Sequence, residues 1–219
     1  MLTEHLLRRG CNVTAVEYDV RLAAFLQDCF KDNDRFFLIV ADACRPEFRA
    51  ELPPSPYRCV SNLPYAASSE IILNLLRAPA PPEEMFLLLQ SEMADRIKAA
   101  PGNKQYGRFS VAVQLDYTVS LRRNVPPNAF WPPPEIHSTF LQLTRVPAED
   151  RLTSPVKETV YEVVKTCFSQ RRKAALKLLR NAYGDALAES IAKDCGIDPK
   201  ARAENISLDQ FIAVARLMC

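Results

Sequence analysis

The sequence predicts an α/β sheet followed by a small all-helical region, and two patterns carry that prediction. Up to Ala100, short apolar runs alternate with segments of helical spacing. Strands that are apolar on both faces must be covered on both sides, so these runs indicate a parallel sheet with helices over each face. After Pro147 only helical spacing remains. We therefore place a domain boundary there and expect domains over residues 1–147 and 148–219.

The first elements follow from residue spacing and from turn residues. A helix is expected over Leu2–Arg9, and Gly10 can end it, because glycine readily adopts the left-handed conformation of a helix C-cap. The chain then alternates strand, helix and strand, with the expected ranges Val13–Glu17, Val20–Phe30 and Phe36–Ala41. This order is typical of a βαβ unit.

The alternation continues through the middle of the chain. Strands and helices are expected in turn over Arg58–Ser61, Ser69–Leu76, Met85–Gln90 and Ser91–Ala100. Two further strands, Thr118–Val125 and Ile136–Arg145, flank a proline-rich loop, and His137 falls inside the second, where a structural role fits it best. Helices complete the chain over Val156–Phe168, Arg171–Tyr183, Leu187–Asp194 and Leu208–Met218.

The composition limits the class of protein. A hydrophobic content of 48% and a charged content of 25% are typical of a soluble globular chain. No apolar run approaches the roughly 20 residues that span a membrane, and charged residues interrupt the N-terminal segment, so we expect a cytoplasmic protein without membrane contact. Seven scattered cysteines without a Cys-x-x-Cys pair argue against a disulfide framework. With only two histidines, no metal site is expected.

Positive charge gathers near the C-terminus. The net charge is +2, and the last 70 residues hold 12 basic and 9 acidic residues. Lys173, Lys177 and Arg180 follow helical spacing, with Arg171 and Arg172 at the start of the same expected helix. Such a face can contact nucleic-acid phosphates, although a solvated helix face shows the same pattern.

Polar side chains end three of the expected strands, at Glu17, Asp42 and Asn62. Ligands of doubly wound sheets bind beyond the carboxyl ends of the strands, so these groups should converge on one rim. Glu17 can accept hydrogen bonds from the ribose hydroxyls of an adenosine-containing cofactor. Asp42 can accept from the adenine amino group while a neighbouring backbone amide reads the ring nitrogen. Either acid alone is equally well explained as a solvated strand end.

The stretch Asn62-Leu63-Pro64-Tyr65 combines an amide, a rigid turn and an aromatic ring at the end of a strand. Methyl transfer to the exocyclic amine of a base requires acceptors that draw the nitrogen lone pair out of ring conjugation. Asn62 and the Leu63 carbonyl can supply them, and Tyr65 can stack on the base. Pro64 fixes its own φ at about −65° and restricts Leu63, which holds that carbonyl in one direction. An ordinary strand-to-loop turn is the alternative.

Taken together, these motifs resemble the S-adenosylmethionine-dependent rRNA adenine N6-dimethyltransferases, in particular the branch that modifies small-subunit rRNA. The resemblance covers almost the entire chain. The matching segments are Val16-Glu17-Tyr18-Asp19, Asp42-Ala43, Asn62-Leu63-Pro64-Tyr65, Leu89-Gln90-Ser91-Glu92, Tyr106-Gly107-Arg108-Phe109-Ser110-Val111, Val125-Pro126-Pro127-Asn128-Ala129-Phe130, Ser169-Gln170-Arg171-Arg172-Lys173 and Arg202-Ala203-Glu204-Asn205-Ile206-Ser207.

The resemblance implies a Rossmann-like class I methyltransferase sheet with a small C-terminal helical domain that faces rRNA. It implies that Glu17 and Asp42, with Ala43, hold S-adenosylmethionine, and that Asn62 lies between the methyl donor and the target amine. Tyr65 and Phe130 would sandwich an adenine extruded from its stack. The implied substrates are the N6 amines of two adjacent adenines near the 3′ end of small-subunit rRNA. The implied partner is the immature small subunit during ribosome biogenesis, bound by a monomer.

The chain departs from the family at its beginning. The match starts just after the family's glycine-rich cofactor loop, so the first strand of the sheet and that loop have no counterpart. We expect an N-terminally truncated or mis-started enzyme whose sheet has unpaired strand edges and whose donor site is incomplete.

Three other interpretations remain open. One is a non-catalytic RNA-binding or ribosome-assembly factor that keeps the family's surface. Another is a methyltransferase acting on protein glutamine or DNA adenine, against which Leu63 and the helical tail count. The third is a methylase of large-subunit rRNA, whose C-terminal region fits this tail less well.

The incomplete donor site yields a first prediction. We expect residues 1–219 to bind S-adenosylmethionine weakly or not at all, because part of the backbone that approaches the donor's methionine portion is missing. Isothermal titration calorimetry on the purified chain measures this directly. Binding in the micromolar range would contradict it.

Overall fold

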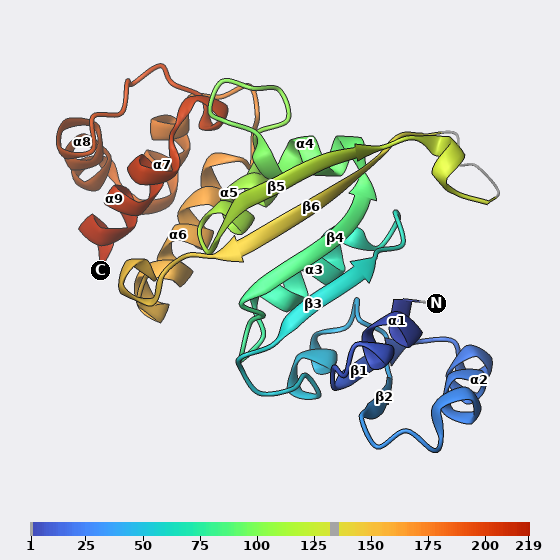
Figure 1. Cartoon of the computed structure of the whole chain (residues 1–219). Coiled ribbons are helices and arrows are strands. Elements are labelled where there is room, and N and C mark those ends of the chain that lie inside the picture. Colours follow the sequence, from blue (N-terminus) through green and yellow to red (C-terminus); the bar gives the residue numbers. More distant parts are fainter. Residues whose placement is uncertain (1, 132–135) are drawn as a thin grey trace. The chain divides into compact units, whose positions relative to one another are not determined.

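The computed structural model describes residues 2–131 and 136–219 and divides the chain into two compact units (Figure 1). The first unit comprises residues 1–59 and 64–83, and the second comprises residues 60–63 and 84–219. The chain thus crosses between the units three times. The division into residues 1–147 and 148–219 rests on the change of sequence pattern and remains a prediction.

The first unit is built on a parallel strand pair. Its elements are α1 (Leu2–Arg8), β1 (Val13–Glu17), α2 (Val20–Phe30), β2 (Phe36–Val40), a 3-10 turn η1 (Pro46–Ala50) and α3 (Ser68–Leu76). The predicted ranges of β1 and α2 are confirmed. Asp19 starts α2 because its side chain accepts from the Arg21 and Leu22 N–H groups. Gly10, with φ of 81°, follows α1 as predicted.

The second unit contains a four-stranded sheet in the order β3-β4-β6-β5. The strands are β3 (Arg58–Asn62), β4 (Glu84–Gln90), β5 (Tyr117–Val125) and β6 (Ser138–Arg145). Figure 1 shows β3 and β4 running in the same direction, whereas β6 is antiparallel to both of its neighbours. The parallel arrangement predicted for the strands before Ala100 is found for β1 with β2 and for β3 with β4, and the hairpin of β5 and β6 adds an antiparallel pair to the second sheet.

Strand pairing leaves β1 and β3 each with one neighbour. Among the described residues, β1 pairs with β2 and β3 pairs with β4, in two separate sheets. An edge strand presents a row of backbone N–H and C=O groups that can pair with another strand.

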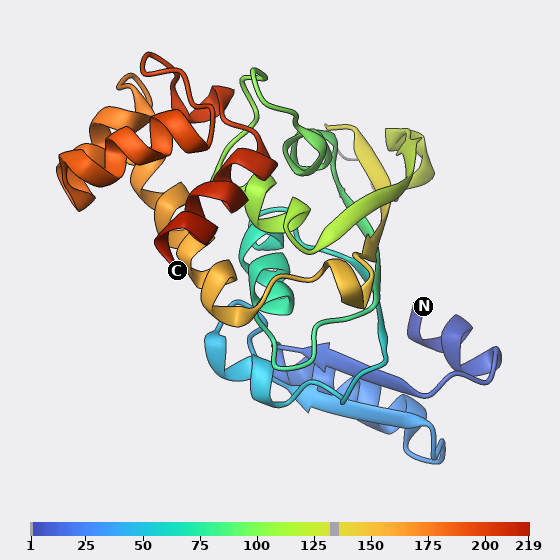
Figure 2. The same cartoon turned by 90° about the vertical axis from the view of Figure 1, so that its left-hand side faces the viewer.

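The second unit contains six α-helices among the described residues, and the last five share one hydrophobic core. The six are α4 (Ser91–Lys98), α5 (Arg108–Gln114), α6 (Ser154–Cys167), α7 (Ala175–Tyr183), α8 (Asp185–Asp194) and α9 (Leu208–Met218), with 3-10 turns η2 (Pro127–Ala129), η3 (Ala148–Asp150) and η4 (Ala203–Asn205). Figure 2 shows the orange-to-red C-terminal helices gathered next to α5. Val111 of α5, Val163 of α6 and Phe211 of α9 are fully buried in this core.

Three sequence predictions need correction here. The helix expected from Arg171 begins at Ala175, because Ala174 is extended and forms an antiparallel bridge with Arg202. His137 precedes β6 rather than lying within it. Helix α5 lies in a segment for which no element was predicted, and its seven residues are too short for a clear helical period.

Among the described residues, no helix is both long and apolar enough to cross a membrane. These residues also contain no cluster of three or more histidine, cysteine, aspartate or glutamate side chains suited to hold a metal ion.

A buried ion pair joins α6 to the start of β5 and yields a stability prediction. Lys157 Nζ contacts Asp116 Oδ2, and the two side chains are 19% and 10% exposed. The change Lys157→Met leaves the Asp116 carboxylate unpaired, so we expect a loss of about 2–3 kcal/mol, somewhat less than for a fully buried pair. Urea unfolding measures it. In the Asp116→Leu background, Lys157→Met should cost much less, and an equal cost would contradict a pairwise effect.

Candidate functional site

Two of the predicted site carboxylates lie side by side in the first unit. Glu17 pairs in register with Val40, and the Ala41 N–H donates to the Glu17 carbonyl at 3.0 Å. Because β1 and β2 are parallel, their carboxyl ends share one edge, which brings Glu17 next to Asp42. The strand register therefore supports the predicted convergence of these two groups. Asn62, the third predicted group, belongs to the second unit.

Backbone hydrogen bonds orient the Glu17 carboxylate. Its Oε1 accepts from the N–H groups of Tyr18 at 2.8 Å and of Asp19 at 2.9 Å. Among the described residues, Oε2 has no hydrogen-bond partner, so this oxygen can accept from a ligand hydroxyl. The carboxylate is thus held in place by its own turn with one acceptor left open, which fits a ribose diol.

The Asp42 carboxylate is held by the loop that follows it. Its Oδ1 accepts from the Cys44 N–H at 2.9 Å, and its Oδ2 lies 3.7 Å from Arg45 Nε at an exposed position. The Arg45 N–H closes the turn by donating to the Asp42 carbonyl at 2.9 Å. The Ala43 N–H donates to no described residue, which leaves it open for a ring nitrogen. The Asp42 carboxylate, as an acceptor, and the Ala43 N–H, as a hydrogen-bond donor, therefore suit the edge of an adenine.

Asn74 anchors this loop and was missed in the sequence. Its side chain is 4% exposed, and its Nδ2 donates to the carbonyls of Ala43 at 2.8 Å and Arg45 at 3.3 Å. Its Oδ1 accepts from Arg49 Nε at 3.0 Å and Nη2 at 2.8 Å. A buried amide requires such partners, and an asparagine among the apolar residues of α3 was the available signal.

The Cys44 thiol lies within the same loop. Burial, and secondarily the charge of Asp42, raises the pKa of the Cys44 thiol. It therefore stays protonated at neutral pH and is a poor nucleophile. A weakly nucleophilic thiol is compatible with a site that would take an electrophilic methyl donor.

The segment Asn62–Tyr65 ends β3 with its backbone fixed. The Leu63 side chain is 5% exposed, and the Leu63 N–H donates to the Leu88 carbonyl at 3.3 Å. The Pro64 carbonyl accepts from the Ala67 N–H at 3.0 Å, and the Tyr65 carbonyl accepts from Ser68 Oγ at 3.1 Å. The Asn62 side chain is exposed. The amide is thus accessible on an anchored backbone, as acceptor chemistry requires.

Phe130 lies in the connection between β5 and β6, which joins the sheet at the end of β4, because Ser138 pairs with Gln90. It is half-buried, and its N–H donates to the Pro127 carbonyl at 3.1 Å. The neighbouring Trp131 is 97% exposed. The following prolines lie outside the described residues.

A chain of hydroxyl and amide groups fixes the base of this hairpin. Ser91 Oγ lies 2.9 Å from Thr139 Oγ1, which in turn lies 3.4 Å from Asn124 Oδ1. The Ser91 N–H also donates to the His137 carbonyl at 3.0 Å. Thr139 is fully buried. These residues connect α4 to the hairpin that carries Phe130, and sequence reasoning did not single them out for that role.

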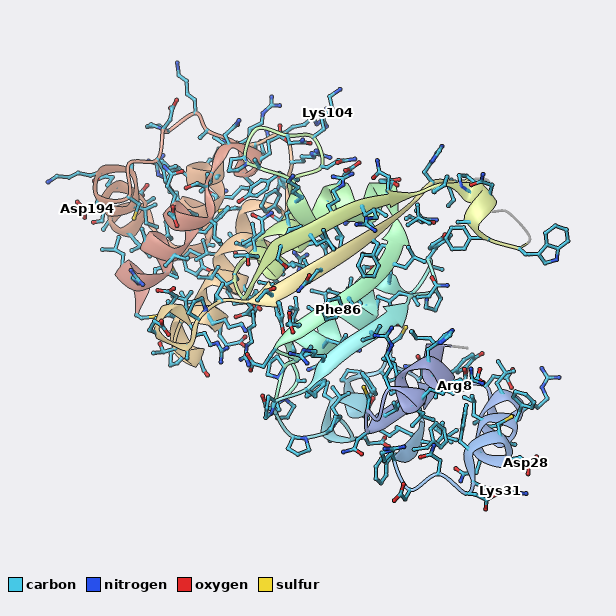
Figure 3. The ribbon with its side chains drawn as sticks, in the orientation of Figure 1. Arg8, Asp28, Lys31, Phe86, Lys104 and Asp194 are labelled. Carbon is cyan, nitrogen blue, oxygen red and sulfur yellow. The ribbon has the colours of Figure 1, made fainter. Side chains whose placement is uncertain are left out.

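The predicted basic residues do not form one helical face. Arg171, Arg172 and Lys173 precede α7, whereas Lys177 and Arg180 lie on it. Arg180 pairs with Asp185 at 2.9 Å, and Arg171 pairs with Glu204 at 3.2 Å. The remaining three are exposed (Figure 3 shows the side chains). The structure thus assigns two of the five to ion pairs within the protein.

Comparison with known proteins places the chain among methyltransferases. Residues 1–218 match the protein family described as ribosomal RNA adenine dimethylase. A ribosomal RNA small subunit methyltransferase A of Syntrophotalea carbinolica is 36% identical, covering 99% of this chain and 81% of the relative. The protein of that name in Lactobacillus helveticus is 34% identical, covering 98% and 77%.

Two solved structures share the fold. The 23S rRNA methyltransferase ErmE has a TM-score of 0.69 at 24% identity, covering 94% of this chain and 81% of its own. A dimethyladenosine transferase from Plasmodium falciparum has a TM-score of 0.70 at 22% identity, covering 93% and 80%. The predicted fold class, a Rossmann-like methyltransferase sheet with a helical C-terminal part, is confirmed.

The buried amide of Asn74 yields a prediction for the Asp42 loop. Asn74→Ala removes the donors of two carbonyls and the acceptor of Arg49, so we expect residues 43–45 to loosen and stability to fall by about 2–3 kcal/mol. Cys44 is a reporter within this loop. Its alkylation rate, followed by peptide mass spectrometry, should rise severalfold, while that of exposed Cys11 should stay constant. An unchanged Cys44 rate would show that Asn74 does not hold the loop.

Proposed function

Because the chain belongs to the ribosomal RNA adenine dimethylase family, we propose that it methylates the N6 amines of two adjacent adenines near the 3′ end of small-subunit rRNA. S-adenosylmethionine is the methyl donor. The observation that carries the proposal is the anchored segment Asn62–Tyr65 at the end of a strand, with an exposed Asn62 side chain, in a family defined by this reaction. The proposed partner is the immature small subunit, met in the cytoplasm by a monomer during ribosome biogenesis.

The first unit supplies the groups that would hold the donor. Glu17 offers one carboxylate oxygen to a ribose hydroxyl, while its other oxygen is fixed by backbone N–H groups. Asp42 and the Ala43 N–H would bind the amino group and a ring nitrogen of the adenine. The bound donor supplies a methyl group on a positively charged sulfur. Two oriented carboxylates and a protonated thiol are compatible with that charge.

The acceptor segment supplies the catalysis. The Asn62 amide oxygen and the Leu63 carbonyl accept hydrogen bonds from the target amine, which turns its lone pair away from the ring. The Leu63 N–H donates to the Leu88 carbonyl, and this bond ties the residue that carries the acceptor carbonyl to β4. Charge then develops on nitrogen against acceptors that are already oriented, and this requires no strong general base. The proton leaves to water after each transfer.

The second methyl transfer limits how the acceptors are used. A monomethylated amine has one N–H, so Asn62 and the Leu63 carbonyl cannot both depend on receiving a hydrogen bond. Tyr65 and Phe130 would hold the base instead. Stacking on an aromatic ring contributes about 1–3 kcal/mol per base, which offsets the cost of extruding the adenine. Exposed Arg172, Lys173 and Lys177 would add phosphate contacts.

Methyl transfer at high donor concentration tests this function. The chain is incubated with unmethylated small subunits and millimolar S-adenosylmethionine, so that weak donor binding does not hide activity. We expect N6,N6-dimethyladenosine in the rRNA digest by mass spectrometry. Asn62→Ala should lower the rate about 100-fold or more, because one oriented polar group at a reacting centre contributes that much.

The matched control is Asn181→Ala, at an exposed position of α7, which should leave the rate unchanged. RNA binding by the Asn62→Ala protein should stay constant. An absence of product at millimolar donor, with RNA binding intact, would favour the non-catalytic ribosome-assembly factor instead.

A further inference from the structure

Trp131 is the most exposed of the large apolar side chains in the described part of the chain, with 97% of its surface open to water. It is also the only tryptophan of the protein. In cores and interfaces an aromatic side chain buries about 150–250 Å², so this ring has a large contact area without a partner. Single exposed apolar residues are common on protein surfaces, and the surroundings of Trp131 therefore decide its role.

The connection that carries Trp131 leaves the second unit's sheet beside the acceptor segment. Ser138, at the start of β6, pairs with Gln90, the last residue of β4. The Leu63 N–H donates to the Leu88 carbonyl, so the acceptor segment reaches β4 within two residues of the same strand end. Both segments therefore depart from one edge of the sheet.

Backbone hydrogen bonds fix the chain immediately before Trp131. In η2 the Ala129 N–H donates to the Pro126 carbonyl at 3.0 Å, and the Phe130 N–H donates to the Pro127 carbonyl at 3.1 Å. Phe130 is extended, with φ of −120° and ψ of 156°. In an extended chain, successive side chains point to opposite sides. Half-buried Phe130 and exposed Trp131 therefore offer two rings that face different ways and cannot share one base.

We propose that Trp131 stacks on the adenine adjacent to the one that is being methylated. The proposal rests on the proposed function, in which two adjacent adenines are substrates and Phe130 helps to hold the extruded one. Extrusion removes the stacking partner of the neighbouring adenine, and the exposed indole ring replaces that partner. Trp131 is thus a substrate-binding residue for the second base of the pair.

The chemistry of the indole ring favours a base over a phosphate group. The ring is uncharged and has a single N–H donor, so it adds little to phosphate binding. Its flat face suits a nucleobase, and one such stack strengthens binding about 10-fold. Because the stack forms when the RNA binds and is unchanged by methyl transfer, it should lower KM and leave kcat largely unaffected.

Fluorescence of the single tryptophan reports this contact directly. The full chain, without methyl donor, is titrated with RNA hairpins whose loops carry adenine at both, one or neither of two adjacent positions, with all other loop positions abasic. A stacked base quenches indole emission, so the two-adenine loop should lower the emission of Trp131 severalfold. A lone adenine should occupy the site at Phe130 and the acceptor segment, which leaves the emission close to that of the free chain.

Two outcomes of this titration would overturn the proposal. One is equal quenching by the one-adenine and two-adenine loops, because Trp131 would then contact the target base itself. The other is unchanged emission at two-adenine RNA concentrations that saturate binding in a gel-shift assay. That result would indicate that the ring serves a protein partner instead.

Substitution measures what the ring contributes to affinity. Trp131→Ala should weaken binding of the two-adenine hairpin about 10-fold, as expected for one lost stack, whereas Trp131→Phe should keep most of the affinity. The one-adenine hairpin should bind the parent chain and Trp131→Ala equally well. The matched control is Phe25→Ala, an exposed aromatic residue of α2, which should keep the parent Kd. An unchanged Kd for Trp131→Ala, or equal losses for the two hairpins, would contradict the proposal.

These measurements separate the stacking contact from methyl transfer. If no methyl transfer is observed but only the two-adenine loop quenches Trp131, the base contact stands and the proposed function fails. In an active chain, Trp131→Ala should raise KM for unmethylated small subunits about 10-fold with little change in kcat. A parent-like KM in that variant would overturn the stacking contact while the proposed function stands.

Discussion

Parallel pairing of β1 with β2 sets Glu17 opposite Val40, and this register is what the donor side of the candidate site depends on. Side chains alternate along a strand, so a slip of one residue would turn Glu17 to the other face of the sheet. The register also brings the loop after β2 to the same edge. With Glu17 oriented by its own backbone turn and Asp42 by the Cys44 N–H, two carboxylates are available to a ligand without rearrangement.

Orientation of the polar groups depends on residues that do not themselves face a ligand. Asn74 holds the carbonyls of the Asp42 loop from inside α3, and the Leu63 N–H ties the acceptor segment to β4. Thr139 connects the hairpin that carries Phe130 to α4 through Ser91. Each of these bonds restricts a backbone segment whose next residues carry the proposed chemistry. Preorganisation of this kind is the main contribution that a protein makes to methyl transfer from an already reactive donor.

The start of α7 shows how a contact between residues far apart in the sequence overrides local helix propensity. Residues 171–180 have good helix formers, and the sequence predicted one continuous basic helix. The bridge between Ala174 and Arg202 keeps the chain extended, so the helix starts at Ala175. Arg171 then lies outside the helix and holds Glu204 and the Lys104 carbonyl, so it joins three segments that are far apart in the sequence.

The sequence alone determined the order and type of most elements, because apolar spacing and turn residues act over a few neighbouring positions. It also indicated the acceptor segment, Glu17 and Asp42 as candidate site residues, since acids and amides that end strands are visible in the residue order. Only the tertiary structure decided that β6 is antiparallel, that Asn74 is a loop anchor, and that Arg171 pairs within the protein. These features depend on contacts between residues tens of positions apart, which no local pattern specifies.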